Sequence, residues 1–340
     1  MGLKWLITGG CGFIGRNLVK HLLHQDPCLI RIVDNFTVGT RDDLARVCDF
    51  KEVDPSRMDA MAGQQAEADK TVQLIEGDIL DPELAERVTR GFDVIVHLAA
   101  NTGVGPSVEN PRMDCETNVI GTLNYLEAAR KNCINRFVFA SSGAPAGEVE
   151  PPIHEELPPH PVSPYGASKL AGEGYCSAYF RTFNVETVCL RFGNVYGPYS
   201  GKKDSVVARF IKQALAGEPL EIYGDGSQTR DFIYIDDLIQ AIQLAAEKKD
   251  VAGEIFQIAT SRETTVNEIT QLIVSELEKK QIKGIEVRFS QPRKGDVKRN
   301  FSDTRKAGKI LGWYPQTDLS RGLRQTLDWF WKVEMQKGVD

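Results

Sequence analysis

The chain has 340 residues, a formal net charge of −6 and 41% hydrophobic residues, which is typical of a globular protein with one large or two ordinary domains. Because the acidic balance (sequence pI about 5.6) comes without a block of basic residues, the sequence favours a small-molecule substrate over nucleic acid or an anionic membrane. The seven cysteines are scattered and form no C-x-x-C pair, so neither a disulfide framework nor a metal site is expected. Since no apolar run is long enough to span a membrane and the N-terminus does not resemble a signal peptide, a cytoplasmic location is expected.

The first stretch of the chain, residues 3–23, predicts a strand, a phosphate-binding loop and a helix. Glycines in such a loop allow a tight turn and let backbone N–H groups reach a pyrophosphate at the positive end of the helix. Glycines alone would equally suit an ordinary helix start, but a second apolar run, residues 29–33, ends in Asp34 about twenty residues later, as the dinucleotide fingerprint requires. The residues expected to contact a dinucleotide here are Gly9, Gly12, Phe13, Ile14, Gly15, Asp34 and Asn35.

Two further apolar runs, residues 72–75 and 94–98, predict buried strands. Ligands of open α/β sheets bind at the carboxyl ends of the strands. The cofactor contacts expected at these two ends are Asp78, Ile79, Leu98, Ala99 and Ala100. Asp78 suits the cap of a helix over 82–90 equally well, so both interpretations stay open. His97 lies inside its strand and is expected to be a hydrogen-bonded core residue rather than a catalyst.

Strands and helices continue to alternate as far as residue 190. A helix over 113–132 is followed by a strand over 136–140, a helix beginning near Tyr165 and a strand over 185–190. This alternation predicts an α/β fold with a Rossmann-type, doubly wound parallel sheet in an NAD-binding domain of residues 1–190. Residues 191–340 are expected to form a smaller mixed α/β lobe, with some segments returning to the first domain. The other expected elements are solvated helices over 41–47 and 56–70 and, in the smaller lobe, helices over 206–216, 236–248, 265–279, 303–311 and 319–333 and strands over 220–223 and 232–234.

Tyr165 and Lys169 stand four residues apart on a predicted helix and therefore share one of its faces. An ammonium group and an oxidised nicotinamide ring nearby would both lower the pKa of a tyrosine, which is about 10 when unperturbed. Ser142, at the end of the preceding strand, would hydrogen-bond the same substrate hydroxyl, so that the three residues could oxidise an alcohol whose hydride passes to the nicotinamide. By itself the Tyr-x-x-x-Lys spacing equally describes a surface pair, and the glycine-rich loop upstream favours the catalytic interpretation.

The order of these motifs along nearly the whole chain resembles the extended short-chain dehydrogenase/reductase family and, within it, the nucleotide-sugar 4-epimerases similar to UDP-glucose 4-epimerase. The motifs that carry the resemblance are TGGCGFIG at 8–15, Asp34, GDI at 77–79, HLAA at 97–100, the serine pair at 141–142, YGASK at 165–169, RFGNVYGP at 191–198 and GDGSQTRDF at 224–232.

The resemblance implies an isomerase reaction on a nucleotide sugar. Tyr165 would take the proton from O4 while hydride leaves C4 to tightly held NAD⁺, and hydride would return to the other face of the 4-keto sugar. Asp34 would bind the adenosine ribose hydroxyls and favour NAD over NADP. A homodimer is implied, formed by a four-helix bundle of the helices over 113–132 and 165–183 and their copies.

The resemblance also assigns the substrate contacts. Asn194 would bind the sugar nucleotide, and Tyr223 would lie near a uracil-type base. Arg230 and Arg293 would bind the diphosphate, for which a guanidinium fork is suited. Asn300 would stand at the gate beside the C2 substituent, where a small residue admits an N-acetyl group.

The chain departs from the family pattern at three places, which leaves the sugar open among UDP-hexose, UDP-N-acetylhexosamine and UDP-hexuronate. Residues 145–147 read Pro-Ala-Gly where many relatives have Val-Tyr-Gly. Residues 143–144 carry no carboxylate, which disfavours a dehydratase or a decarboxylase. Tyr199 stands where some uronate-handling relatives have arginine. A dehydratase, decarboxylase or reductase, and less so a non-catalytic NAD-binding sensor, remain the alternatives.

Overall fold

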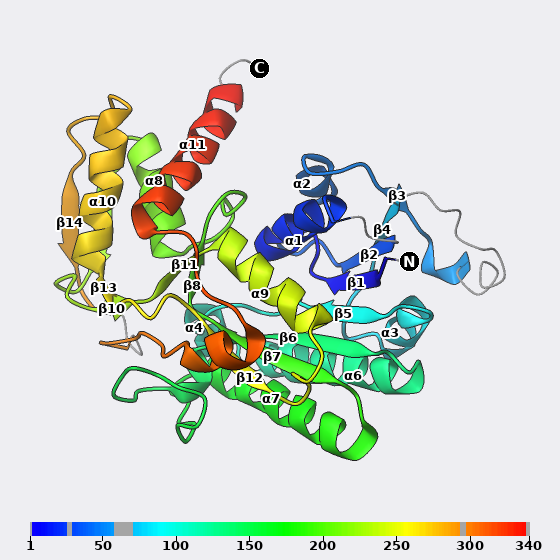
Figure 1. Cartoon of the computed structure of the whole chain (residues 1–340). Coiled ribbons are helices and arrows are strands. Elements are labelled where there is room, and N and C mark those ends of the chain that lie inside the picture. The colour runs from blue at the N-terminus through cyan, green and yellow to red at the C-terminus, as the bar shows by residue number, and fades with distance from the viewer. Residues whose placement is uncertain (1, 26–28, 58–70, 293–296, 338–340) are drawn as a thin grey trace. The chain divides into compact units, whose positions relative to one another are not determined.

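The computed structural model describes residues 2–25, 29–57, 71–292 and 297–337, with side chains up to residue 333 (Figure 1). The chain divides into two compact units. The first unit consists of Met1–Gly147, Pro158–Arg191 and Ala241–Phe256, and the second unit consists of Glu148–Leu157, Phe192–Gln240 and Gln257–Asp340. The sequence predicts domains of residues 1–190 and 191–340, with some segments returning to the first domain; in the structure, 241–256 belongs to the first unit and 148–157 to the second.

An eight-stranded sheet with the order β12-β7-β6-β5-β1-β2-β4-β3 forms the base of the first unit. Its strands are β1 (Lys4–Thr8), β2 (Leu29–Asp34), β3 (Lys51–Glu52), β4 (Thr71–Glu76), β5 (Val94–His97), β6 (Arg136–Ser142), β7 (Thr187–Phe192) and β12 (Ile255–Ile258). The neighbouring strands from β6 to β3 are all parallel. Because β1 lies between β2 and β5, the sheet is wound outward in both directions from its centre. The predicted doubly wound α/β fold is confirmed.

The helical segments of the first unit are α1 (Phe13–Leu23), α2 (Arg41–Ala45), the 3₁₀ turn η1 (Pro55–Arg57), α3 (Pro82–Thr89), α4 (Val104–Glu109), α5 (Pro111–Cys115), the π turn η3 (Glu116–Ile120), α6 (Gly121–Lys131), the 3₁₀ turn η4 (Ala144–Ala146), α7 (Pro164–Phe183) and the larger part of α9 (Ile235–Glu247). Of these, α3, α6 and α7 share the core of the sheet. Leu6, Leu126, Phe137 and Cys176 represent the core, since each is fully buried among residues of the strands, α6 and α7. Strands that are buried on both faces appear in a sequence as continuous apolar runs.

Several boundaries differ from the prediction. The single helix expected over 113–132 is divided into α5, η3 and α6, and η3 holds one extra residue because its hydrogen bonds run from i to i+5. The strand expected over 72–75 is the fourth in the chain, because the short exposed strand β3 precedes it. Of the helix expected over 56–70, residues 56–57 belong to η1 and residues 58–70 lie outside the described residues.

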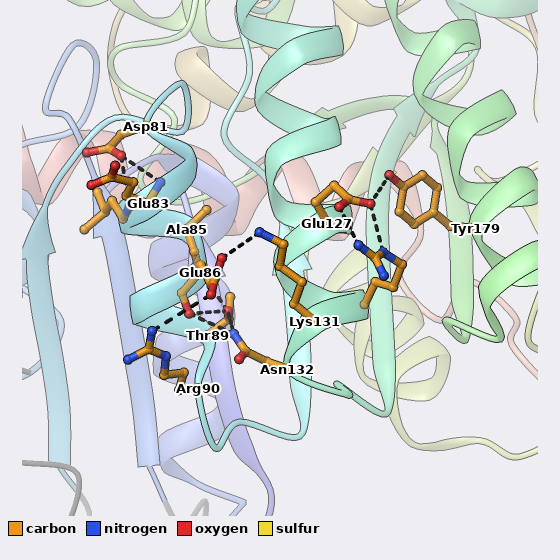
Figure 2. Close-up of polar contacts among 12 residues, drawn as sticks. Asp81, Glu83, Ala85, Glu86, Thr89, Arg90, Glu127, Lys131, Asn132 and Tyr179 are labelled. Atoms are coloured by element: carbon orange, nitrogen blue, oxygen red, sulfur yellow. Dashed lines mark hydrogen bonds and ion pairs between the residues drawn. The ribbon is translucent and has the colours of Figure 1, made fainter. Parts of the chain in front are cut away.

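Polar contacts connect α3, α6 and α7 on one side of the first unit (Figure 2). Lys131 at the end of α6 donates to Glu86 of α3 over 2.7 Å, and Asn132 donates to the Glu86 carbonyl oxygen over 2.8 Å. On α7, the Tyr179 hydroxyl donates to Glu127 of α6 over 2.5 Å. These bonds fix α6 against both of its neighbouring helices, in addition to the apolar contacts between them.

In its described residues, the second unit combines three short strand pairs with four helical segments of its own. Its strands are β8 (Asn194–Tyr196), β9 (Leu220–Tyr223), β10 (Thr229–Arg230), β11 (Phe232–Tyr234), β13 (Thr264–Thr265) and β14 (Val287–Ser290), and its helices are α8 (Val206–Leu215), α10 (Val266–Lys279), the π turn η5 (Ala307–Leu311) and α11 (Leu319–Lys337). β8 pairs with β11 and β9 with β14, both in parallel, whereas β10 and β13 are antiparallel. β8, β10, β13 and β14 are absent from the sequence prediction. β10 and β13 have only two residues each and none of the four residues of β14 is buried, so no apolar run marks them in the sequence.

Across the described part of the chain, none of the helices combines the length and the apolar character that crossing a membrane would need.

Candidate functional site

The glycine-rich turn between β1 and α1 forms the first part of the site. Gly9 has φ +70°, and a Cβ there would lie 2.9 Å from the backbone nitrogen of Ala99. A Cβ at Gly15 would lie 2.5 Å from the Cα of Gly10, so this turn closes tightly only with glycine. Gly12 is the N-cap of α1 and offers no side-chain oxygen to the first helical N–H groups. A helix start of this kind, with its positive dipole end and its free N–H groups, suits an anionic pyrophosphate.

Asp34 lies at the end of β2 beside this turn. Its carboxylate is buried and accepts hydrogen bonds from the backbone N–H groups of Cys11 and Phe36, each over 2.9 Å. Burial raises the pKa of Asp34, and these two hydrogen bonds act in the opposite direction. The carboxylate is thus fixed next to the glycine turn, where an acidic residue can accept from ribose hydroxyls.

Asn35 and Asp78 contact each other at the ends of β2 and β4. The Asn35 amide donates to Asp78 Oδ2 over 2.9 Å, and Asp78 Oδ1 accepts from the backbone N–H of Leu80. The cap of α3 is Asp81, whose carboxylate accepts from two backbone N–H groups of the first turn. The interpretation of Asp78 as that helix cap is therefore wrong, which leaves the cofactor contact as the open prediction.

The end of β5 lies against β1 and the glycine turn. Thr8 accepts from the backbone N–H of Leu98 through its carbonyl oxygen and from that of Ala99 through its hydroxyl, over 3.2 and 3.1 Å. His97 is buried, and its two ring nitrogens lie 3.0 Å from the Thr8 hydroxyl and 3.3 Å from the Thr122 hydroxyl. Burial lowers the pKa of His97 to about 3, so the ring is neutral and its core position agrees with the prediction.

Helix α7 places three side chains, four residues apart, on the end of β6. The Ser142 side chain acts on the Tyr165 hydroxyl and lowers its pKa, the Lys169 Nζ lies 6.0 Å from the centroid of the Tyr165 ring, and Lys169 donates to the carbonyl oxygen of Ala140 over 2.9 Å. Glu173 accepts from the Ser141 hydroxyl over 2.6 Å. Ser141 and Ser142 are the last two residues of the strand rather than the start of the following loop. The structure thus brings the predicted trio of Tyr165, Lys169 and Ser142 together in the first unit.

Burial dominates the electrostatics of this trio. It raises the pKa of Tyr165 to about 12, although the hydrogen bond with Ser142 lowers it. The same effect lowers the pKa of the Lys169 ammonium to about 8. The sequence predicts a tyrosine pKa lowered by the ammonium and an oxidised nicotinamide ring together, which concerns the protein with its cofactor; in the protein by itself, burial raises the pKa of Tyr165. A phenolate at neutral pH therefore needs further positive charge beside the ring.

Glu173 and Arg191 form a buried ion pair that is absent from the sequence-based predictions. Arg191, on β7, donates through Nε and Nη2 to the two carboxylate oxygens over 2.8 and 2.7 Å. Both side chains are less than 5% exposed. A signal was present, since Glu173 follows Lys169 by the same four-residue spacing that separates Lys169 from Tyr165.

Three of the predicted substrate residues lie close to β10 in the second unit. Arg230 donates to the carbonyl oxygens of Thr229 and Val297 over 2.6 and 2.7 Å. The backbone N–H of Asn300 donates to the Thr229 hydroxyl over 3.3 Å, and that of Asn194 donates to the carbonyl oxygen of the residue after Arg230 over 2.7 Å. Asn194, Arg230 and Asn300 therefore share one neighbourhood, whereas Arg293 lies outside the described residues.

Tyr223, at the end of β9, borders a pocket of about 760 Å³ in the second unit. The pocket is lined by residues including Tyr223, Gln228, Phe289, Pro292 and Lys298. Gln228 donates to the Tyr223 carbonyl oxygen over 2.7 Å, and the Arg209 guanidinium lies 4.8 Å from the centroid of the Tyr223 ring. An aromatic ring held in this way, with amide groups nearby, can stack on and hydrogen-bond a planar base.

The comparisons with known proteins show which family the chain belongs to. A family model described as the NAD dependent epimerase/dehydratase family matches residues 5–259. The chain belongs to this family. It is 37% identical over 330 residues to the putative UDP-glucose 4-epimerase of Methanocaldococcus jannaschii, with 95% of this chain and 97% of the relative covered. The predicted family is thereby confirmed.

Two solved structures of the same family extend the likeness to the fold. The UDP-glucose 4-epimerase of Thermotoga maritima with UDP-glucose has a TM-score of 0.85 and 34% identity, over 98% of this chain and 100% of that chain. The dTDP-glucose 4,6-dehydratase DesIV of Streptomyces venezuelae, with NAD bound, has a TM-score of 0.85 and 31% identity, over 98% of both chains. NAD as the cofactor is confirmed, and the chain is an enzyme of a family that includes nucleotide-sugar epimerases and dehydratases.

Proposed function

We propose that this enzyme epimerises C4 of a UDP-sugar through a 4-keto intermediate, with Tyr165 as the base. The observation that carries the proposal is the joint position of Tyr165, Ser142 and Lys169 at the end of β6. The named epimerases among its relatives support the same reaction. The dehydratase alternative is disfavoured because the segment 143–147 after Ser142 contains no carboxylate that could serve as a second acid or base.

The first unit would hold the cofactor. The glycine turn fits a pyrophosphate because it closes against Ala99 only without side chains, and Asp34 would accept from the adenosine ribose hydroxyls. Asn35 and Asp78 would contact the adenine side. The remaining proposed contacts are Gly9, Gly12, Phe13, Ile14, Gly15, Ile79, Leu98, Ala100, Tyr165 and Lys169. NAD, when bound, supplies the acceptor and later the donor of the C4 hydride.

The catalytic residues would act on O4 of the sugar. Tyr165, as phenolate, takes the O4 proton while Ser142 donates a hydrogen bond to the same oxygen. The Lys169 ammonium favours the phenolate over the neutral phenol. Once the 4-keto sugar has turned its opposite face, Tyr165 gives the proton back to O4, so that neither an external reductant nor a net proton is consumed.

The second unit would bind the nucleotide and the sugar. Tyr223 and its pocket would receive the uracil-type base, Arg230 and Arg293 the diphosphate, and Asn194 the sugar nucleotide. Asn300 would border the C2 substituent, since its backbone is bonded next to Arg230. An asparagine there leaves more room than a bulky aromatic residue, so UDP-N-acetylhexosamines are expected to be accepted along with the unsubstituted hexoses.

The enzyme is also proposed to be a homodimer through α5–α6 and α7. Several large apolar side chains on these helices are exposed, namely Met113, Ile120, Tyr175 and Phe183, each between 39% and 47%. An isologous four-helix contact would cover them. Light scattering at micromolar concentration tests this assembly, and a monomer would contradict it.

The reaction is tested by incubating the purified protein with NAD and a panel of UDP-, dTDP- and GDP-sugars while following the products by NMR. We expect a new sugar of unchanged mass that retains a deuterium label placed at C4. Loss of water or of carbon dioxide, or net reduction of NAD, would refute epimerisation. The variant Tyr165→Phe serves as the control for background chemistry.

A further inference from the structure

Lys169 lies in a low-dielectric environment in which few charges can act on it. Its side chain is 3% exposed, its Nζ donates to the carbonyl oxygen of Ala140, and the ring of Phe139 lies 5.0 Å from Nζ. An ammonium group in such surroundings loses its proton more easily than in water unless a negative charge compensates. The catalytic role proposed above needs the charged form, so the compensating group matters.

Asp114, on α5, is a fully buried carboxylate close to this helix. It is 0% exposed, and Oδ1 accepts from the side-chain amides of Asn118 and Asn101 over 3.0 and 3.3 Å. Among the described residues, Oδ2 has no hydrogen-bond donor, although it is shielded from solvent. A buried carboxylate with an unsatisfied oxygen lowers the stability of a protein. Its presence here is therefore best explained by a role in the function of the site.

The contact between this carboxylate and the catalytic helix runs through Asn118 in the π turn. The Asn118 amide donates to Asp114 Oδ1 and also to the hydroxyl of Ser168, each over 3.0 Å. Ser168 directly precedes Lys169 on α7, and α5 and α7 pack against each other. The π turn directs Asn118 inward, because it is 1% exposed, and π turns are frequent at functional sites.

The other ionisable groups around Lys169 compensate its positive charge less than the Asp114 carboxylate does. Glu173, on the next turn of α7, also raises the pKa of Lys169, but less than Asp114 does, and its carboxylate forms an ion pair with Arg191 of β7. Burial raises the pKa of Tyr165 on α7 and lowers that of His97 on β5, so both side chains are neutral at neutral pH. In the described parts of the chain, no lysine, arginine or histidine forms an ion pair with Asp114 within 4 Å.

We propose that Asp114 is a positioning residue whose buried carboxylate keeps Lys169 in its ammonium form beside Tyr165. The inference rests on the proposed epimerase function of this site. It adds a residue that the reaction needs, although the Asp114 side chain touches neither the substrate nor the cofactor.

The electrostatics support this proposal and give the direction of the expected pKa shifts. The negative charge of Asp114 raises the pKa of Lys169, against the burial that lowers that pKa to about 8. The same charge raises the pKa of Tyr165. Removing it should lower both pKa values, so that both limbs of the pH–rate profile move toward acid. A merely structural loss would lower the rate at every pH and leave the limbs in place.

The test measures the pKa of Lys169 directly. Protein with ¹³C-labelled lysine side chains is titrated by NMR, without and with NAD, and the Cε signal is assigned with Lys169→Arg. We expect Asp114→Asn to lower this pKa by about one pH unit or more, and Asp114→Glu, which keeps the charge, to restore most of it. The matched control is Glu116→Gln, which removes an exposed carboxylate two residues away that pairs with Arg112 and should leave the pKa of Lys169 unchanged.

The outcomes separate this inference from the proposed function. An unchanged Lys169 pKa in folded Asp114→Asn would overturn the inference whether or not any sugar is epimerised, because the titration needs no substrate. If Asp114→Asn does not fold, Asp114→Ser, which leaves room for water, is measured in its place. Failure of both variants to fold would show that the carboxylate serves the fold and would equally overturn the inference. With an active substrate, the basic limb of kcat must move to lower pH together with the Lys169 pKa.

Discussion

The ion pair between Glu173 and Arg191 allows the sharpest prediction on stability. In Glu173→Gln the amide oxygen can still accept from Ser141, so the change removes the negative charge and leaves most of the packing. Arg191 is then a buried cation without its bidentate partner, since both side chains are less than 5% exposed. Breaking one half of a buried ion pair costs about 3–5 kcal/mol. We therefore expect the free energy of unfolding to fall by about this amount.

The matched control is Glu186→Gln in the pair between Arg136 and Glu186. That pair has a similar distance, 2.8 Å, but Glu186 is 51% exposed, and Arg136 keeps its bonds to the carbonyl oxygens of Ala245 and Lys248. An exposed partner of this kind contributes about 0–1 kcal/mol. Urea unfolding followed by circular dichroism compares the two variants. If Glu173→Gln loses no more stability than Glu186→Gln, the energetic argument for the buried pair fails.

Four further substitutions test the proposed site. Tyr165→Phe removes the ionisable oxygen alone and should lower kcat by about 10²–10⁴-fold while leaving thermal unfolding and NAD binding nearly unchanged; a variant that keeps most activity rejects the base. Ser142→Ala removes one hydrogen bond and should lower kcat less than Tyr165→Phe in the same assay, and a reversed order would exchange their roles. Asp34→Ala should weaken NAD and relax the bias against NADP, as measured by calorimetric titration of both cofactors; an unmoved preference would make Asp34 structural. Asn300→Tyr should suppress turnover of UDP-N-acetylhexosamines and spare turnover of UDP-glucose. An equal loss of turnover for both sugars would contradict the assignment of Asn300 to the gate beside the C2 substituent.

Strands β1, β2, β4, β5, β6 and β7 of the central sheet could be predicted from the sequence because buried parallel strands leave continuous apolar runs. The same is true of Tyr165 and Lys169, whose spacing alone puts them on one helix face. Strand β12 is absent from the sequence prediction, since its four residues include Gln257 and form only a short apolar run. Strand β3 could not be predicted, since Lys51 and Glu52 are exposed and have no apolar signal.

The remainder of the site depends on contacts that no local pattern encodes. Asp114 is identified as part of the site only when the fold places α5 against α7. The raised pKa of Tyr165 depends on how deeply the ring is buried, and the exchange of segments 148–157 and 241–256 between the two units depends on contacts far apart in sequence.

The π turn between α5 and α6 makes a single-residue deletion less disruptive at this point than elsewhere in the same helices. Each residue of an α-helix advances the side chains by about 100°, so a deletion within α6 would rotate the residues on one side of it by about that angle. The π turn holds one extra residue, and deleting one residue from 116–120 would convert it to an α turn that keeps the flanking helices in phase. Asp114 before the turn and Thr122 and Tyr125 after it, which are all at most 1% exposed, would then still face inward. A deletion scan of 104–131 should therefore show more folded protein for deletions in the π turn than for deletions in α6, and a minimum at the π turn would refute this reasoning.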